Sequence, residues 1–170
     1  MSDNKNRKLV QGALFAALCT VMTLVIQVPS PMEGYVNLGD CAVLMSAWVL
    51  GPVYGGAAAG LGSMLADVLS GYAHYAPGTL VIKGAMAAAA ALIFQALQNH
   101  IPRLPAQAVS GLAAEAIMVS GYFGYSSLLL GKGLAAAASI PGNVIQGIFG
   151  LIAAAAVYQI LDHSRVLARL

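Results

Sequence analysis

The sequence predicts an all-α integral membrane protein, a bundle of six transmembrane helices with both termini in the cytoplasm. Composition indicates the membrane: 59% of the 170 residues are hydrophobic and only 8% are charged, whereas an ordinary soluble domain is about 25% charged. The mean hydropathy of +0.80 agrees. Because too few polar residues remain to enclose a core, we expect lipid to surround the bundle. The chain length favours a single membrane domain over 1–170.

Apolar segment lengths define the expected helices, since about 20 apolar residues cross the hydrocarbon of a bilayer. The first segment, from Leu9 to Val28, is longer than the apolar region of a signal peptide, and we interpret it as a retained helix. The second is short, and Pro52 with nearby glycines separates it from the third without a polar loop. The six expected spans are 9–28, 40–53, 55–72, 78–97, 106–130 and 135–161.

The lysine and arginine residues predict the orientation. With six spans both termini share one side, and six of the eight cations fall on that side. Lys132 lies on the opposite side, and Lys83 lies within a span. The positive-inside rule then makes the cation-rich side cytoplasmic, as in a multi-pass protein of a bacterial-type plasma membrane. The six cations are Lys5, Arg7, Lys8, Arg103, Arg165 and Arg169.

The first span contains a stripe of small residues near its cytoplasmic end. In "GALFAALCT", Gly12 pairs with Ala16 and Ala13 with Ala17, each at four-residue spacing. Small residues at this spacing let another helix approach closely within lipid. The spacing leaves open whether that helix belongs to this chain or to another protein.

Three charges interrupt the second to fourth spans. A charge at the centre of a bilayer costs about 2.5–3.5 kcal/mol, so each needs a role. Asp40 begins the second span, where we expect it to cap the helix and reach interfacial water. Asp67 and Lys83 lie at similar depths on neighbouring antiparallel helices, so we expect them to form an ion pair. That pair either joins the helices only or also lines a ligand pocket.

A second polar group occupies the last two spans. Glu115 lies near the middle of the fifth span without an obvious basic partner, so we expect it to lose its charge or face a polar cavity. Tyr122 and Tyr125 follow it, and Asn143 and Gln146 share a face of the sixth span. A carboxyl group, amides and phenol rings suit a small, flat, polar ligand. The alternative is that these groups only hold the helices together.

Two loops on the outer side are placed to cover such a pocket. The loop at 29–39, within "PSPMEGYVNLG", offers Tyr35 and Asn37 and is the expected lid. The loop "GYAHYAPG" offers Tyr72, His74 and Tyr75, of which the histidine alone is a weak signal.

Several classes of function are disfavoured. The sequence has no HExxH pair, nucleophile elbow or phosphate-binding loop, so we expect neither enzyme activity nor a metal or cofactor site. A net charge of +2 is too small to imply a nucleic-acid partner. Cys19 and Cys41 are too few for a disulfide framework and are expected to be unpaired. No internal repeat supports a self-sufficient carrier.

The block "NLGD…GP…G…GS…AD…GY…P…IKG", followed by "IPGNVIQG" at the start of the last helix, resembles the substrate-binding S component of energy-coupling factor (ECF) transporters. The similarity extends over nearly the whole chain in size, helix count, termini and the small-residue stripe. It implies a protein that captures a vitamin or vitamin precursor from outside. Such a protein then docks on a transmembrane coupling protein that works with two cytoplasmic ATPases, and topples in the bilayer to release the ligand.

The resemblance also implies site residues. The docking stripe of the family corresponds to Ala13 and Ala17, and the expected docking residues also include Gly12 and Ala16. The ligand site of the family corresponds to the outer polar groups described above. The branch is similar to S components for hydroxymethylpyrimidine or vitamin B6 compounds, while riboflavin, pantothenate and thiamine stay open. A non-transporting assembly protein is the alternative class. The expected ligand-site residues are Tyr35, Asn37, Asp67, Tyr75, Lys83, Glu115, Tyr122, Asn143 and Gln146.

Overall fold

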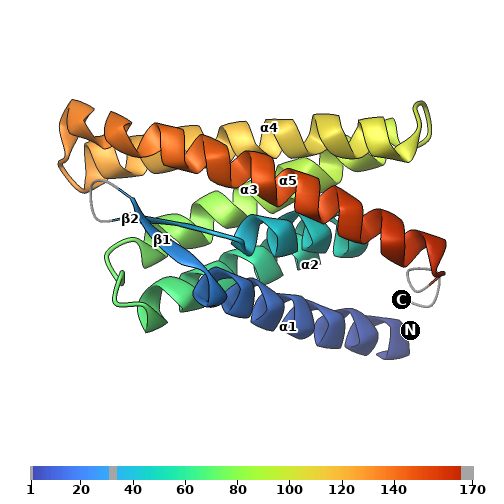
Figure 1. Cartoon of the computed structure of the whole chain (residues 1–170). Helices are drawn as coiled ribbons and strands as arrows, with labels where there is room; N and C mark the ends of the chain where they lie inside the picture. Colours follow the sequence, from blue (N-terminus) through green and yellow to red (C-terminus); the bar gives the residue numbers. More distant parts are fainter. Residues whose placement is uncertain (1, 31–33, 166–170) are drawn as a thin grey trace.

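The computed structural model describes residues 2–30 and 34–165, which form a bundle of helices with one short β-hairpin (Figure 1). The described elements are, in chain order, α1 (Ser2–Val25), β1 (Gln27–Ser30), β2 (Gly34–Asn37), α2 (Gly39–Leu69), α3 (Ala76–Leu97), α4 (Arg103–Gly124), a π-helix η1 (Tyr125–Leu129), a 3₁₀-helix η2 (Gly133–Ser139) and α5 (Ile140–His163). The expected all-α class is therefore confirmed for the described residues, except for two short strands: β2 lies in the expected lid loop, and β1 begins at Gln27, within the expected first span, because α1 ends at Val25.

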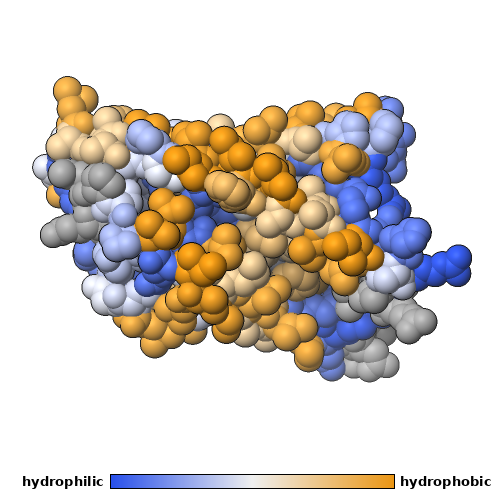
Figure 2. Space-filling view, in the orientation of Figure 1, coloured by the Kyte–Doolittle hydropathy of each residue, from blue (hydrophilic) through white to orange (hydrophobic). Residues whose placement is uncertain are grey.

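The bundle has two distinct ends (Figure 1). We call the end with β1 and β2 the hairpin end, and the end where α1 begins and α5 ends the terminal end. The side of the molecule in Figure 2 shows a broad band of hydrophobic residues between hydrophilic ends, most strongly hydrophilic at the terminal end. Among the described residues, four helical segments are long and apolar enough to cross a membrane: Lys5–Val25, Gly39–Leu69, Ala76–Leu97 and Gly133–His163.

Helix α2 consists of two arms that meet at a break. Gly51 has φ 79° and ψ −175°, a conformation that glycine adopts without steric cost, and Pro52 disfavours a helical residue before it. The two arms fold back on each other at this break. A hydrogen bond joins them, in which Ser46 Oγ of the first arm donates to the carbonyl of Gly55 in the second at 3.1 Å. A Cβ atom on Gly55 would lie 2.5 Å from the Ser46 carbonyl oxygen, so the close turn requires glycine at that position.

The break falls close to the predicted division between spans 40–53 and 55–72. At 1.5 Å per residue the first arm is only about 18 Å long, against a hydrocarbon thickness of about 30 Å. The count of six spans therefore stays a prediction. At the other end of the chain, the predicted span 106–130 corresponds to α4 with η1, and 135–161 to η2 with α5.

Close contacts between small residues pack α2 against its neighbours. A Cβ on Gly60 would lie 2.6 Å from the Leu80 carbonyl oxygen of α3, and one on Gly62 would overlap the Ala16 carbonyl of α1. Such approach of backbones is the usual way in which membrane helices associate. Cys19 and Cys41 are buried and free, which confirms that they are unpaired.

Candidate ligand-binding site

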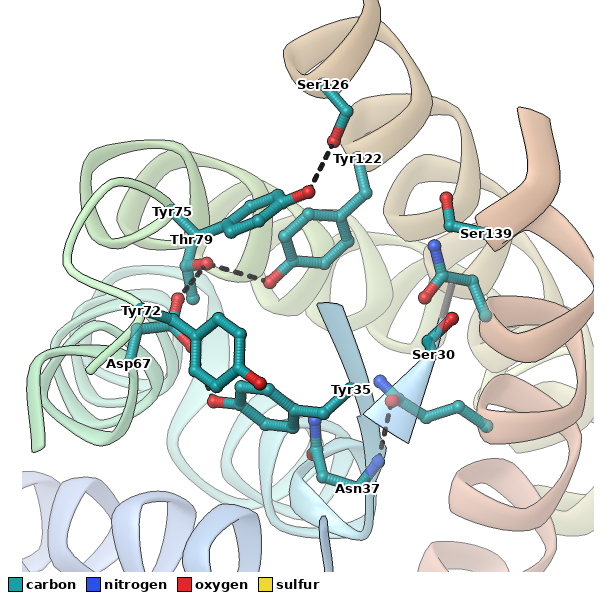
Figure 3. Close-up of a pocket in the computed structure, with 12 residues that line it drawn as sticks. Ser30, Tyr35, Asn37, Asp67, Tyr72, Tyr75, Thr79, Tyr122, Ser126 and Ser139 are labelled. Carbon is teal, nitrogen blue, oxygen red and sulfur yellow. Dashed lines mark hydrogen bonds between the residues drawn. The ribbon is translucent and has the colours of Figure 1, made fainter. Parts of the chain in front are cut away.

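A polar and aromatic cavity of about 50 Å³ lies at the hairpin end (Figure 3). Seven parts of the chain build it: the β-hairpin, the C-terminal end of α2, the loop between α2 and α3, the start of α3, the end of α4 with η1, the end of η2, and the start of α5. Its lining residues are Ser30, Tyr35, Asn37, Asp67, Tyr72, Tyr75, Thr79, Tyr122, Ser126, Ser139, Asn143 and Gln146. We refer to it as the pocket.

Tyrosine rings form one side of the pocket. The ring of Tyr35 on β2 lies 4.9 Å from that of Tyr72, centroid to centroid, and Tyr75 lies 6.4 Å from Tyr122. Figure 3 shows these four rings grouped around the space, with Ser30 and Ser139 on the facing side and Asn37 below Tyr35. Tyrosine rings in this arrangement offer flat apolar faces together with hydroxyl groups, so the pocket is suited to a planar ligand with polar edges.

The Asp67 carboxylate organises the floor on this side. Tyr35 Oη donates to Asp67 Oδ1 at 2.5 Å, and Thr79 Oγ1 donates to Oδ2 at 2.5 Å. Thr79 Oγ1 also lies 3.0 Å from Tyr122 Oη. The pKa of Tyr35 is raised above its ordinary value, first by burial and then by the charge of Asp67, so its phenol stays protonated and donates. The hairpin is thereby tied to α2 and α3.

Lys83 is paired with Asp40, so the predicted Asp67–Lys83 ion pair is wrong. The exposed fraction of Lys83 is 3% and that of Asp40 is 0%. The expectation that Asp40 caps its helix and reaches interfacial water is also wrong, because Asp40 makes no capping bond and is fully buried. The physical reason is that the β-hairpin and α5 cover the start of α2, which removes Asp40 from water.

Gln146 connects this ion pair to the pocket. Its Nε2 donates to Asp40 Oδ2 at 2.6 Å, and its Oε1 accepts from the backbone N–H of Asn37 at 2.8 Å. Lys83 does not line the pocket, although its Nζ lies 5.6 Å from the centroid of the Tyr122 ring. The buried pair therefore supports the pocket from beneath, and the hairpin, α2, α3 and α5 are joined through one network.

Glu115 lies apart from the pocket. It lines a groove of about 600 Å³ between α4 and α5, which is otherwise lined mainly by apolar side chains such as Leu112, Phe123 and Ile148. Only 7% of Glu115 is exposed, and neither carboxyl oxygen has a hydrogen-bond partner among the described residues. Its part in ligand binding stays a prediction. We call this surface the α4–α5 groove.

The structure brings seven of the nine expected site residues to the pocket, all except Lys83 and Glu115. Thr79 and Ser126 also line the pocket, although neither was predicted; each stands four residues from an expected residue, Lys83 and Tyr122 respectively, and so shares its helix face. Tyr72, expected in the covering loop, lines the pocket too. Ser30 and Ser139 have no signal in the sequence that distinguishes them from other serines.

The small-residue stripe of α1 divides into two pairs. Ala16 faces α2 at Gly62, whereas Ala13 and Ala17 are exposed. A Cβ on Gly12 would have no neighbour within 4 Å. Docking of a partner on Ala13 and Ala17 stays a prediction.

The described residues contain no group of three or more His, Cys, Asp or Glu side chains arranged to hold a metal ion.

Comparisons with known proteins agree over most of the chain. The family model described as "ECF-type riboflavin transporter, S component" matches residues 3–163. A Pyrococcus woesei protein described as "Uncharacterized protein in gap 3'region" is 35% identical over 134 residues, which are 78% of this chain and 86% of that protein. The thiamine precursor transporter HmpT of Lactococcus lactis subsp. cremoris (strain MG1363) is 25% identical over 170 residues, 98% of this chain and 95% of HmpT.

A solved structure has a similar fold. The chain described under "Structure and mechanism of the S component of a bacterial ECF transporter" superposes with a TM-score of 0.66 at 21% identity, covering 94% of this chain and 97% of that one. At this identity the likeness bears on the fold alone.

Proposed function

Because this chain belongs to the family of ECF-type riboflavin transporter S components, we propose that its pocket captures a small heteroaromatic vitamin or vitamin precursor for an ATP-driven importer. Members of this family are membrane-embedded substrate-binding proteins of transporters, not enzymes. The observation that supports the proposal most strongly is the polar, tyrosine-lined pocket at one end of an otherwise apolar bundle. Stacking faces and fixed hydrogen-bonding groups are what a planar polar ligand requires.

The chemistry of the pocket favours a neutral ligand. Among the described residues no lysine or arginine lines it, although Lys132 Nζ donates to Tyr75 Oη at 3.3 Å. A phosphorylated or carboxylated ligand would call for charge-assisted hydrogen bonds from such cations. A ring with hydroxymethyl groups and ring nitrogens instead matches phenols, hydroxyls and amides. We therefore favour hydroxymethylpyrimidine or a vitamin B6 vitamer, and the similarity to a thiamine precursor transporter supports the first of these.

The size of the pocket supports a single-ring ligand. A cavity of about 50 Å³ has room for a few water-sized groups only. Binding therefore requires the β-hairpin or the tyrosine rings to move apart, and one ring requires less movement than the three fused rings of riboflavin. Riboflavin and thiamine are the next candidates, and pantothenate, an anion without a ring, fits least well. A non-transporting assembly protein is the alternative outside transport.

The proposed topology has six spans in one membrane domain, the hairpin end outside, and the terminal end in the cytoplasm of a bacterial-type cell. The described cations at the terminal end, Lys5, Arg7, Lys8, Arg103 and Arg165, support it by the positive-inside rule; Arg169 lies outside the described residues. The proposed partners are a transmembrane coupling protein, which docks on the exposed Ala13 and Ala17, and two cytoplasmic ATPases.

Native mass spectrometry of the purified protein tests the ligand first. We expect a co-purified mass that matches hydroxymethylpyrimidine or a B6 vitamer, and stabilisation by the same compound in a thermal-shift series with riboflavin, thiamine and pantothenate. Asn143→Ala should weaken binding by about 1–3 kcal/mol by leaving a ligand group unpaired. The matched control is Asn99→Ala, at an exposed position beyond α3. A protein that no vitamin stabilises would favour the assembly protein instead.

A further inference from the structure

A second cavity, of about 340 Å³, lies at the terminal end. It is partly open, it lies between the first turns of α1, the break of α2 at Gly51, the last turn of α3 and Tyr158 of α5, and it shares no lining residue with the pocket. A volume in the range of about 300–1,000 Å³ is typical of small-molecule sites. We call it the terminal cavity.

The lining of the terminal cavity is basic and polar on one side. Arg7 and Lys8 of α1 contribute two cations, and Gln11, Gln95 and Gln98 contribute amide groups. No carboxylate is among the described residues that line it. Asp162, the acidic residue of α5, does not line the cavity and accepts from Arg103 Nη1 at 2.5 Å. The charge of this lining therefore complements an anion.

The other side of the terminal cavity is apolar and aromatic. Trp48, Phe94 and Tyr158 pack with ring centroids 6.0–6.1 Å apart, and all three are buried. Their edges complete the cavity lining with Val49 and Leu50. A small inorganic anion would leave this apolar surface unused, whereas an amphiphile would cover it.

The exposed surface of α1 extends the apolar side into the membrane. Arg7, Gln11, Leu14 and Leu18 are spaced at i, i+4, i+7 and i+11, so they lie along one face of the helix. Leu14 is 68% exposed and Leu18 is 41% exposed. A charged head at Arg7 would therefore be followed by a strip of apolar side chains that leads toward the middle of the bilayer. Figure 2 shows the same change from hydrophilic to hydrophobic away from the terminal end.

From this arrangement we infer that the terminal cavity binds the phosphodiester headgroup of an anionic phospholipid, held by Arg7 and Lys8, with its acyl chains along Leu14 and Leu18. Basic pockets between transmembrane helices are suited to such headgroups. Ala13 and Ala17 lie on a different face of α1. A bound lipid therefore leaves the exposed alanine pair free.

The test uses the full-length protein in nanodiscs that contain phosphatidylcholine with phosphatidylglycerol. Native mass spectrometry after gentle release should show one retained phosphatidylglycerol in preference to phosphatidylcholine. Arg7→Gln with Lys8→Gln should weaken that retention about 30-fold, since each cation near an anionic lipid strengthens binding about fivefold. Both side chains are exposed, so we expect the variant to fold and to bind its vitamin ligand as before.

The matched control is Lys5→Gln with Arg165→Gln, which removes the same charge at the terminal end but outside the terminal cavity and should leave retention unchanged. Equal losses in both variants would mean diffuse attraction and would overturn the site. A second readout is Trp48, the single tryptophan of the chain, whose emission should shift with phosphatidylglycerol but not with phosphatidylcholine. An equal shift with millimolar glycerol phosphate or inorganic phosphate would mean an anion site that does not recognise lipid.

Discussion

The pocket and the α4–α5 groove both contain a buried carboxyl group, but within the described part of the chain only the carboxyl group at the pocket has hydrogen-bond partners. At the pocket, Asp67 accepts two hydrogen bonds, and beneath it Asp40 is held by Lys83 and Gln146. In the groove, Glu115 has no partner among the described residues. Buried polar groups are usually satisfied. The difference indicates that the floor of the pocket is held by paired polar groups, while the groove retains a carboxyl group that costs stability.

The largest effect should come from breaking the ion pair under the pocket. Lys83→Met leaves the Asp40 carboxylate buried without its counter-charge, which costs about 3–5 kcal/mol. Thermal unfolding in one detergent measures the loss. Asp40→Asn in the same chain should recover part of it by removing the unpaired charge. Arg103→Met, which breaks an exposed pair with Asp162, should cost at most about 1 kcal/mol. Equal effects of the two single variants would contradict the assignment.

A smaller loss should follow from changing the floor of the pocket. Asp67→Asn keeps the size of the side chain but replaces one acceptor oxygen by a donor, which then faces the hydroxyl of Tyr35 or Thr79. One mismatched buried group costs about 1–3 kcal/mol. The same thermal assay should show this loss, and vitamin affinity should fall with it. An Asp67→Asn protein as stable as the wild type would mean that these short contacts contribute little.

The corresponding change in the groove should have the opposite sign. Glu115→Met replaces an unpartnered carboxyl group by an apolar side chain of similar length in an apolar groove, so we expect stability to rise by about 1–3 kcal/mol. Vitamin affinity then decides between two roles. Unchanged affinity would separate Glu115 from the ligand site, whereas a loss comparable to that of Asn143→Ala would restore it to the site.

The smallest effect on stability, but a large one on uptake, is expected on α1. Ala13→Leu enlarges an exposed side chain, so stability and ligand binding should change by less than about 0.5 kcal/mol. Vitamin uptake by cells should be lost, because the added atoms keep the partner helix away. Leu14→Phe adds bulk on another face of α1 and should leave uptake intact. Normal uptake with Ala13→Leu would contradict docking at this position.

The sequence predicted the membrane class, the family and most of the pocket residues, because the length of an apolar segment and the depth of a residue within it follow from the order of residues along the chain. It paired Lys83 with Asp67 rather than Asp40, since depth does not specify which face of a helix a side chain occupies. The β-hairpin was the missing information, because its strands, paired from Gln27 with Asn37 to Ser30 with Gly34, cover the start of α2. In the sequence, the eleven residues 29–39 contain two prolines and are typical of an irregular loop.

The break at Gly51 has a consequence for how the protein is made. At about 18 Å the first arm of α2 is shorter than the hydrocarbon is thick, so we expect residues 39–69 to enter the membrane together and the two arms to fold back on each other there. Asp40 then enters 43 residues ahead of the lysine that neutralises it. We therefore expect Asp40 to be buried stably only after α3 has been synthesised and Lys83 can neutralise its charge.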